Sequence, residues 1–233
     1  MTQPLYKVVI DTIVGRIASG ALPPGAMLPS ETQLGAELGV SQGTARKALS
    51  ELEARGLVQR AQGRGTFVTV RTPESSLFNF FRLRNPDGSQ TIPELVSEHV
   101  TRRAATDTEA SKLYGTPRDV VEIERVRSLS GVPLVHEVSV VPLPLFAGIA
   151  DRAPLPNTLY VFYQQAYSCI IVRADEKLRS IPAPAPAAAA LGLDRDAPVL
   201  SVERIATDVL GRAVERRTSI CATHGYSYFV SLS

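Results

Sequence analysis

Apolar side chains recur at helical spacing from Leu5 to Ile17, which predicts an amphipathic helix over this stretch. A second helix is predicted to begin after Ser30. Ser30 and Gln33 have the spacing of a capping box, in which each side chain satisfies a backbone amide of the other residue. Gly39 ends this helix after about two turns. Two consecutive short amphipathic helices are therefore expected near the N-terminus.

A third helix and a hairpin are predicted to follow directly. Ser41 caps the third helix, whose apolar residues all lie on one side, and Gly56 ends this helix. Short strand-like runs at 57–60 and 66–68 flank a polar Gly-Arg-Gly turn. The order of helix, tight turn, capped helix and hairpin is that of a winged helix-turn-helix.

Beyond a polar, proline-containing stretch the pattern becomes mixed α and β. We expect a domain at 1–70, a linker at 71–76 and a second domain at 77–233. A weak internal repeat places a short helix before a pair of strands twice, so two halves joined edge to edge would form one antiparallel sheet covered by helices. The predicted elements are strands at 120–126, 134–141, 199–205 and 218–222 and helices at 106–113 and 184–191.

Composition narrows the class of protein. The 233 residues are 44% hydrophobic and 21% charged, which is typical of a folded globular chain. No apolar run approaches the roughly 20 residues of a membrane helix. The two cysteines, Cys169 and Cys221, cannot build a disulfide framework, and no metal quartet accompanies them. We therefore expect a cytoplasmic protein without a metal or cofactor.

The charge is unevenly placed. Residues 1–70 hold seven basic and five acidic side chains, so this segment carries the whole net charge of +2. The outer face of the third helix presents Gln42, Thr44, Arg46 and Lys47, residue types that contact base edges and phosphates from a major groove. The alternative is the solvated face of an ordinary helical bundle.

The run from Pro29 to Val68, PSETQLGAELGVSQGTARKALSELEARGLVQRAQGRGTFV, resembles the winged-helix domain of GntR-family bacterial transcription regulators, and the resemblance spans residues 5–68. It implies that Thr44 and Arg46 touch DNA and that Gly65 lets the wing approach a minor groove. At two positions where the family commonly has arginine, this sequence has glutamine, namely Gln33 and Gln42. The expected DNA-binding residues are Gln33, Gln42, Thr44, Arg46, Lys47, Arg64 and Gly65.

Residues 77–231 contain the motifs Arg125-x-Arg127, Gly131-x-Pro133, Glu137, Asn157-Thr158-Leu159-Tyr160 and, near the end, Glu215. With these motifs the segment resembles the UTRA ligand-binding domain of the HutC-type branch, which has a fold like that of chorismate lyase. Strand alternation places Arg125 and Arg127 on one face with Val121 and Ile123. An arginine that continues an apolar face is paired internally, reaches solvent or binds an anion. An internal partner at Glu137 or Glu215 and a ligand contact both remain open. The effector-binding residues expected from the resemblance are Glu94, Arg125, Arg127, Glu137, Thr158, Tyr160 and Glu215.

Together these features predict a DNA-binding transcription regulator, more consistent with a repressor, whose operator binding responds to a small anionic metabolite. The family resemblance implies a homodimer on a pseudo-palindromic double-stranded DNA operator, and no membrane partner is expected. Glu94 would repel a phosphate, which favours a carboxylate or amine-bearing effector over a sugar phosphate. The alternatives are an enzyme with a chorismate-lyase-like domain and a DNA-binding protein without a ligand. No acid–base or nucleophilic constellation supports an enzyme.

Overall fold

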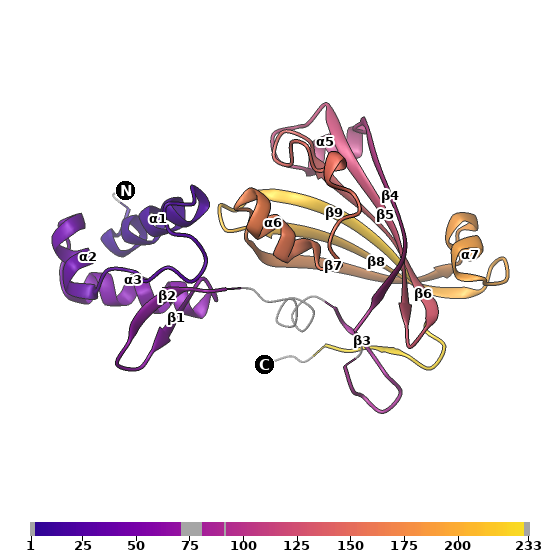
Figure 1. Cartoon of the computed structure of the whole chain (residues 1–233), viewed down its shortest axis with the longest axis horizontal. Coiled ribbons are helices and arrows are strands. Elements are labelled where there is room, and N and C mark those ends of the chain that lie inside the picture. Colours follow the sequence, from indigo (N-terminus) through magenta and orange to yellow (C-terminus); the bar gives the residue numbers. More distant parts are fainter. Residues whose placement is uncertain (1–2, 71–80, 91, 231–233) are drawn as a thin grey trace.

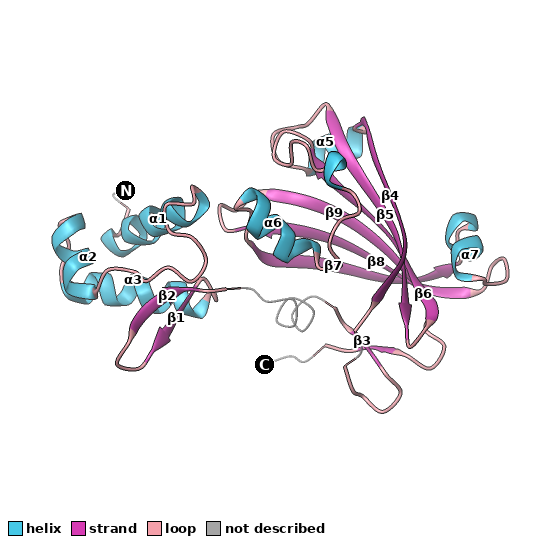
Figure 2. Ribbon diagram, in the orientation of Figure 1, coloured by secondary structure: helices cyan, strands magenta, loops and turns pink. Residues whose placement is uncertain are grey.

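A computed structural model of the chain describes residues 3–70, 81–90 and 92–230. The predicted linker, 71–76, lies outside these residues. Figures 1 and 2 show a small helical part at the N-terminal end and a larger part built on a curved sheet. Within the described residues, no helix has the length and apolar character needed to cross a membrane.

The N-terminal part is the expected winged helix. It contains α1 (Leu5–Ala18), α2 (Glu31–Leu38), α3 (Gln42–Ala54), β1 (Val58–Ala61) and β2 (Gly65–Val68). The capping box of Ser30 and Gln33 is present, and the Ser41 side chain accepts from the backbone amide of Thr44. Apolar faces of all three helices pack into one core with the hairpin. The sequence prediction for this part is confirmed.

The C-terminal part is built on a six-stranded antiparallel sheet with the order β4-β5-β6-β9-β8-β7. The two central strands, β6 and β9, join the halves predicted from the repeat, each of which contains a strand, a short helix and a hairpin. This agrees with the expected α+β fold. The strands are β4 (Glu94–Ala104), β5 (Asp119–Leu129), β6 (Val132–Pro142), β7 (Ile171–Pro182), β8 (Pro198–Asp208) and β9 (Ala213–Cys221). The helices are α5 (Asp107–Lys112), the 3-10 turn η1 (Ala150–Arg152), α6 (Leu159–Tyr167) and α7 (Ala185–Leu191).

The sequence pattern did not predict β4, β7 or α6. Both strands lie at the edges of the sheet and are largely exposed or half-buried, so they lack a clean apolar face. Helix α6 is short, rich in aromatic residues and has no side-chain cap. A second small sheet, β3 (Leu83–Arg84) with β10 (Ser227–Tyr228), was also not predicted.

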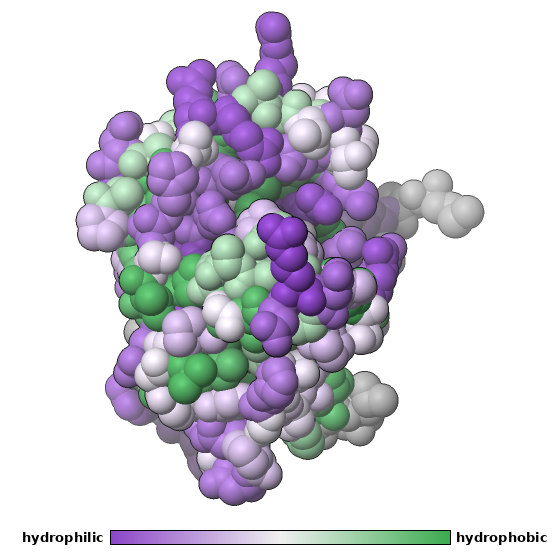
Figure 3. Space-filling model, turned by 90° about the vertical axis from the view of Figure 1, so that its right-hand side faces the viewer, coloured by the Kyte–Doolittle hydropathy of each residue, from purple (hydrophilic) through white to green (hydrophobic). Residues whose placement is uncertain are grey.

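Helices cover the sheet on two faces. Aromatic residues of α6 pack with Val121 and Ile123 of β5. Leu113, after α5, packs with Val120 and Val140, and α7 packs on Val199 and Ile220. Because side chains alternate along a strand, Val120, Val140, Val199 and Ile220 lie on the face of the sheet opposite α6. Figure 3 shows the end of the molecule nearest α7, where apolar residues gather below a strongly polar region.

The winged helix contacts the sheet domain beyond the C-terminal end of α6. Ile170 is 6% exposed and belongs to the same apolar cluster as Ile13 and Ile17 of α1. Val172 and Val209 pack against that cluster from β7 and from the β8–β9 turn. Side chains therefore link the two parts of the chain.

Candidate DNA-recognition surface and effector cavity

The first turns of α3 carry the candidate DNA-contacting side chains. The Ser41 cap positions this part of the helix, and Thr44 Oγ1 lies 2.9 Å from Ser41 Oγ. The side chain of Arg46 is 60% exposed, and its Nε donates to Glu31 Oε2 on α2 at 2.8 Å. Lys47 is exposed, with its Nζ 4.2 Å from the centre of the Tyr6 ring. Cationic groups thus lie on the open side of α3.

The two glutamines at expected arginine positions have local partners. Gln33 Oε1 accepts from the Ser30 backbone amide at 2.9 Å, so this side chain is part of the α2 cap. Gln42 is exposed, and its Nε2 lies 3.5 Å from Glu31 Oε2. Glu31 therefore contacts both Gln42 and Arg46, placing a carboxylate at the centre of this surface.

The wing tip exposes Arg64 and Gly65. Gly65 has a φ of +115°, a conformation that residues with a side chain rarely adopt. A Cβ placed there would meet the terminal methyl group of Met27 at 2.8 Å. Glycine at this position is therefore required by the hairpin itself, in addition to any closeness to DNA.

A cavity opens on the sheet face that carries α6, beside the N-terminal end of that helix. Its volume is about 50 Å³. The N-cap residue Thr158 makes no side-chain capping bond, and Leu159 and Tyr160 of the first turn line the cavity. Uncapped backbone amides at a helix start favour an anion. The lining is completed by Phe81, Pro93, Arg127, Glu137, Asn157, Thr158, Arg204 and Arg217.

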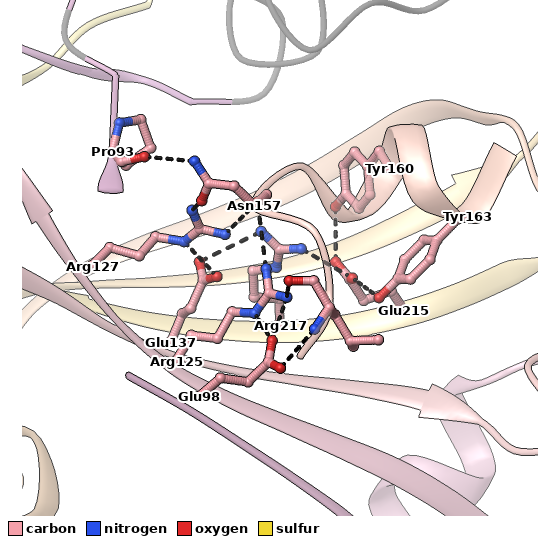
Figure 4. A network of polar contacts seen from close by, with 11 residues as sticks. Pro93, Glu98, Arg125, Arg127, Glu137, Asn157, Tyr160, Tyr163, Glu215 and Arg217 are labelled. Carbon is pink, nitrogen blue, oxygen red and sulfur yellow. Dashed lines mark hydrogen bonds and ion pairs between the residues drawn. The ribbon is translucent and has the colours of Figure 1, made fainter. Parts of the chain in front are cut away.

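Arg125 lies beneath this region and not in the cavity lining (Figure 4). It pairs with Glu98, its register partner on β4, with Nε at 2.7 Å from Oε2. Its Nη2 also donates to the Leu155 carbonyl at 3.2 Å. Burial and the nearby charge of Arg127 lower the pKa of Arg125. Its contacts hold the segment before α6 against β5, a partner choice that the sequence interpretation did not include.

Arg127 does line the cavity. Its Nε donates to Glu137 Oε1 at 2.8 Å, and its Nη1 and Nη2 donate to the side chain and carbonyl of Asn157 at 2.5 and 2.9 Å. Asn157 Nδ2 in turn donates to the Pro93 carbonyl at 2.8 Å. Burial opposes ionisation of Glu137, but Arg127 and Arg217 outweigh it and lower the pKa of its carboxyl to about 2. The carboxylate is therefore charged at neutral pH.

Arg217 lies between two carboxylates and joins the remaining site residues (Figure 4). Its Nη1 is 3.5 Å from Glu137, and its Nη2 is 3.0 Å from Glu215. Glu215 is fully buried and accepts hydrogen bonds from Tyr160 at 2.8 Å and Tyr163 at 3.0 Å. Burial and the charge of Glu215 raise the pKa of Tyr160 to about 12, so this phenol remains a hydrogen-bond donor.

The structure brings most of the predicted effector residues together. Arg127, Glu137, Thr158 and Tyr160 line the cavity, and Glu215 lies under it. Glu94 is the exposed first residue of β4 and is not part of the lining. The sequence interpretation missed four residues of this network, namely Glu98, Asn157 as a contact residue, Arg204 and Arg217. The alternation of Glu215 and Arg217 along one strand was a signal that could have identified Arg217.

Arg204 is the third arginine in the lining and is also nearly buried. Its Nε donates to Glu176 Oε1 on β7 at 2.6 Å. The side chain is 9% exposed, and the neighbouring strand position on β9 is Arg217. The described residues contain no group of three or more histidine, cysteine or acidic side chains that could hold a metal ion.

Comparison with known proteins finds a matching family for each of the two parts of the chain. Residues 5–68 match the family described as bacterial regulatory proteins, gntR family, and residues 95–227 match the UTRA domain. The repressor NagR of Bacillus subtilis is 29% identical over 227 residues, covering 97% of this chain and 93% of NagR. The mannosyl-D-glycerate system repressor MngR of Escherichia coli is 28% identical, covering 97% of this chain and 95% of MngR. The histidine utilization repressor of Pseudomonas aeruginosa is 30% identical, covering 86% of this chain and 80% of that repressor.

Solved structures give the same result for the fold. The ligand-binding domain of a GntR-family regulator from Bordetella bronchiseptica matches 66% of this chain and 97% of its own, with 28% identity and a TM-score of 0.58. PhnF from Mycobacterium smegmatis matches 97% of this chain and 99% of its own at 22% identity, with a TM-score of 0.56, which shows the shared fold. The protein is a DNA-binding regulator with an effector-binding domain. It belongs to the GntR family, in the UTRA-containing branch of HutC and NagR type, and it is a transcriptional repressor; its relatives are regulators, not enzymes.

Proposed function

We propose that this repressor acts in the cytoplasm as a homodimer on a pseudo-palindromic operator. Each subunit places α3 in a major groove and the wing tip in the adjoining minor groove. The observation that supports this is the open, cationic side of α3, opposite its buried Ala45, Ala48 and Leu49. The proposed DNA contacts are Gln33, through its Nε2, Gln42, Thr44, Arg46, Lys47, Arg64 and Gly65.

Selection of binding sites from a random DNA pool tests the operator geometry. A homodimer selects two inverted half-sites with a fixed spacing, and the complex contains two chains by light scattering. A single half-site bound by one chain would overturn the dimer proposal. The UTRA domain is the expected dimer contact, because its sheet has two edge strands, β4 and β7, and its end nearest α7 carries apolar patches (Figure 3).

We infer that the cavity beside α6 binds the effector and that the effector carries a negative charge. The single observation that carries this is the lining at an uncapped helix start, which contains three arginines, Arg127, Arg204 and Arg217, and one carboxylate, Glu137. Glu176 and Glu215, which pair with Arg204 and Arg217, lie outside the lining. Guanidinium groups in a buried site suit a carboxylate or a phosphate. Thr158 and Tyr160 supply hydroxyl groups for the same ligand. Arg125 supports the segment before α6 rather than contacting the ligand.

A carboxylate is favoured over a sugar phosphate. Glu137 lines the cavity next to the arginines and, with the buried Glu215 beneath it, repels the second charge of a phosphate, whereas Glu137 suits hydroxyl or amine groups of a carboxylate metabolite. Two relatives are named for a mannosyl-D-glycerate system and for histidine utilization, and glycerate and histidine each carry a carboxylate. Glu94 lies outside the lining, so its charge contributes less than the sequence suggested.

Native mass spectrometry of the purified protein, followed by calorimetry with any copurified metabolite, tests this assignment. Arg127→Ala is expected to weaken binding about ten- to a hundredfold, since a charge-assisted hydrogen bond contributes about 1.5–3 kcal/mol. Arg102→Ala is the matched control, because Arg102 is 62% exposed and pairs with Asp119 away from the cavity. Equal losses in the two variants would place the ligand elsewhere.

Helix α6 is the proposed connection from effector to DNA. Its first turn lines the cavity, and Ile170, three residues beyond its last residue, packs into the core of the winged helix. A ligand that shifts the first turn therefore also shifts the contact with α1. Operator release follows if the ligand favours an arrangement in which the two α3 helices no longer fit successive major grooves.

A further inference from the structure

A second cavity adjoins the first on the same face of the sheet. The two linings share Phe81, Glu137, Arg204 and Arg217. The second cavity has a volume of about 40 Å³ and extends away from α6, toward β3 and β10. We call the first cavity the head lobe and the second the tail lobe. The tail lobe is further lined by Arg82, Leu83, Val135, Val202, Ser219, Cys221 and Tyr228.

The two lobes differ in chemistry. The head lobe has Asn157, Thr158 and Arg127 around the start of α6. The tail lobe has an apolar wall formed by Leu83, Val135, Val202 and Cys221, and it also contains Arg82, Ser219 and Tyr228. Burial and the nearby charge of Glu137 raise the pKa of the Cys221 thiol to about 12, so this thiol is uncharged at neutral pH. A group that packs on the apolar wall is therefore removed from water against aliphatic side chains and a neutral thiol.

The small sheet of β3 and β10 borders the tail lobe. Leu83 and Tyr228 are register partners in that sheet, and both line the lobe. The Tyr228 hydroxyl contacts Glu176, the same carboxylate that pairs with Arg204. These strands cover one side of the tail lobe, so a group in the lobe lies between them and the six-stranded sheet, and this confinement selects by size and shape.

Arg217 lines both lobes, so its guanidinium lies at the boundary between them. Its Nε and Ser139 Oγ, on its register partner, are buried without a hydrogen-bond partner among the described residues, and both atoms are closed off from the cavities. A guanidinium carries several N–H donors, so its place at the boundary favours a ligand with an acceptor oxygen there.

We propose that the effector has three parts: an anionic head in the head lobe, an acceptor oxygen beside the Arg217 guanidinium and a compact apolar tail on the apolar wall of the tail lobe. This proposal rests on the proposed function of the head lobe. One water-sized group occupies about 10–15 Å³ of a cavity, so the tail lobe takes a tail of about three or four heavy atoms. The carbonyl oxygen of an acyl group or the bridging oxygen of an ester fits the middle position.

Calorimetry with two ligand series tests the tail. The first series is N-acylglycines from N-formyl to N-pentanoyl, and the second is alkyl phosphates from methyl to butyl. In at least one series the affinity is expected to rise about three- to fourfold for each added methylene, as burial of that group predicts, until the lobe is full. The series that binds also identifies the head as carboxylate or phosphate.

Cys221→Met fills the tail lobe and is expected to abolish the gain in affinity from lengthening the tail. Cys169→Met is the matched control, because Cys169 is equally buried but lines neither lobe. Val202→Leu, a smaller change on the same wall, replaces Cys221→Met if that variant does not fold. If the short members bind but a longer tail brings no gain in affinity, the proposal for the tail lobe is wrong and the head lobe stands. The same conclusion follows if the gain in affinity persists in the variant whose tail lobe is filled. Failure of both series to bind overturns the anionic site itself.

Discussion

Glu31 Oε2 on α2 accepts a hydrogen bond from Arg46 Nε on α3, and the two atoms are 2.8 Å apart. The carboxylate therefore fixes the guanidinium at the outer side of the recognition helix before any DNA arrives. The same carboxylate lies 3.7 Å from Arg60 of the wing. One acidic residue thus organises cations from α3 and from the hairpin.

Arg46→Ala is expected to weaken operator binding by about 1–3 kcal/mol, because a guanidinium that reads a base edge contributes about that much. The measurement is a gel-shift titration at fixed salt. Arg55→Ala is the control, since Arg55 lies at the other end of α3 and pairs with Glu51. Unchanged operator affinity in Arg46→Ala would remove this residue from the interface.

The wing is tested at Arg64. Arg64→Ala is expected to weaken binding to all sequences and to reduce the slope of log affinity against log salt by about one, as loss of one phosphate contact predicts. Gly65→Val is also expected to weaken binding, but its positive φ and the nearness of Met27 add strain to the hairpin. Footprints that protect the same nucleotides in Arg64→Ala and the parent would exclude the wing contact.

The buried pair of Arg125 and Glu98 is expected to be structural. Arg125→Ala leaves the Glu98 carboxylate uncompensated, which typically lowers the free energy of unfolding by about 3–5 kcal/mol. The double variant Arg125→Met with Glu98→Leu should lose much less, because no unpaired charge remains. Urea unfolding measures both. A stable Arg125→Ala that fails to bind effector would instead assign Arg125 to ligand contact.

Acid is expected to destabilise the sheet domain through Glu137. Its pKa is lowered to about 2 in the folded protein from an ordinary 4.5, so the folded state favours the charged carboxylate. This contribution is present above pH 4.5 and is lost as the pH falls from about 5 to about 2; it is on the order of 3 kcal/mol. Urea unfolding between pH 7 and pH 3 should show a shallower loss in Glu137→Gln than in the parent. Glu51→Gln, on the exposed side of α3, should follow the parent.

The contact of Ile170 with the winged helix predicts a coupling variant. Ile170→Ala is expected to keep effector affinity and operator affinity, each measured alone, while the effector changes operator affinity several-fold less than in the parent. Ile205→Ala, on the outer face of β8, is the control. Full effector response in Ile170→Ala would show that the signal does not pass through this contact.

The winged helix could be derived from the sequence because its signals are local. The capping box of Ser30 and Gln33, the Ser41 cap and the apolar spacing of α1 and α3 each involve residues within a few positions of one another. Such contacts form whatever the rest of the chain does. The alternation of β5 likewise placed Arg125 and Arg127 on one face before any pairing was known.

Tertiary structure alone decided which partner each arginine has and which of them reaches the cavity. Arg125 pairs with Glu98, 27 residues earlier, and Arg127 contacts Asn157, 30 residues later. Arg217 enters the site because β9 lies beside β6 at the centre of the sheet. Strand alternation specifies a face, but only the order and register of strands bring distant side chains together. Because partner choice depends on those long-range pairings, the sequence by itself determined a cationic sheet face, and the fold made it a cavity.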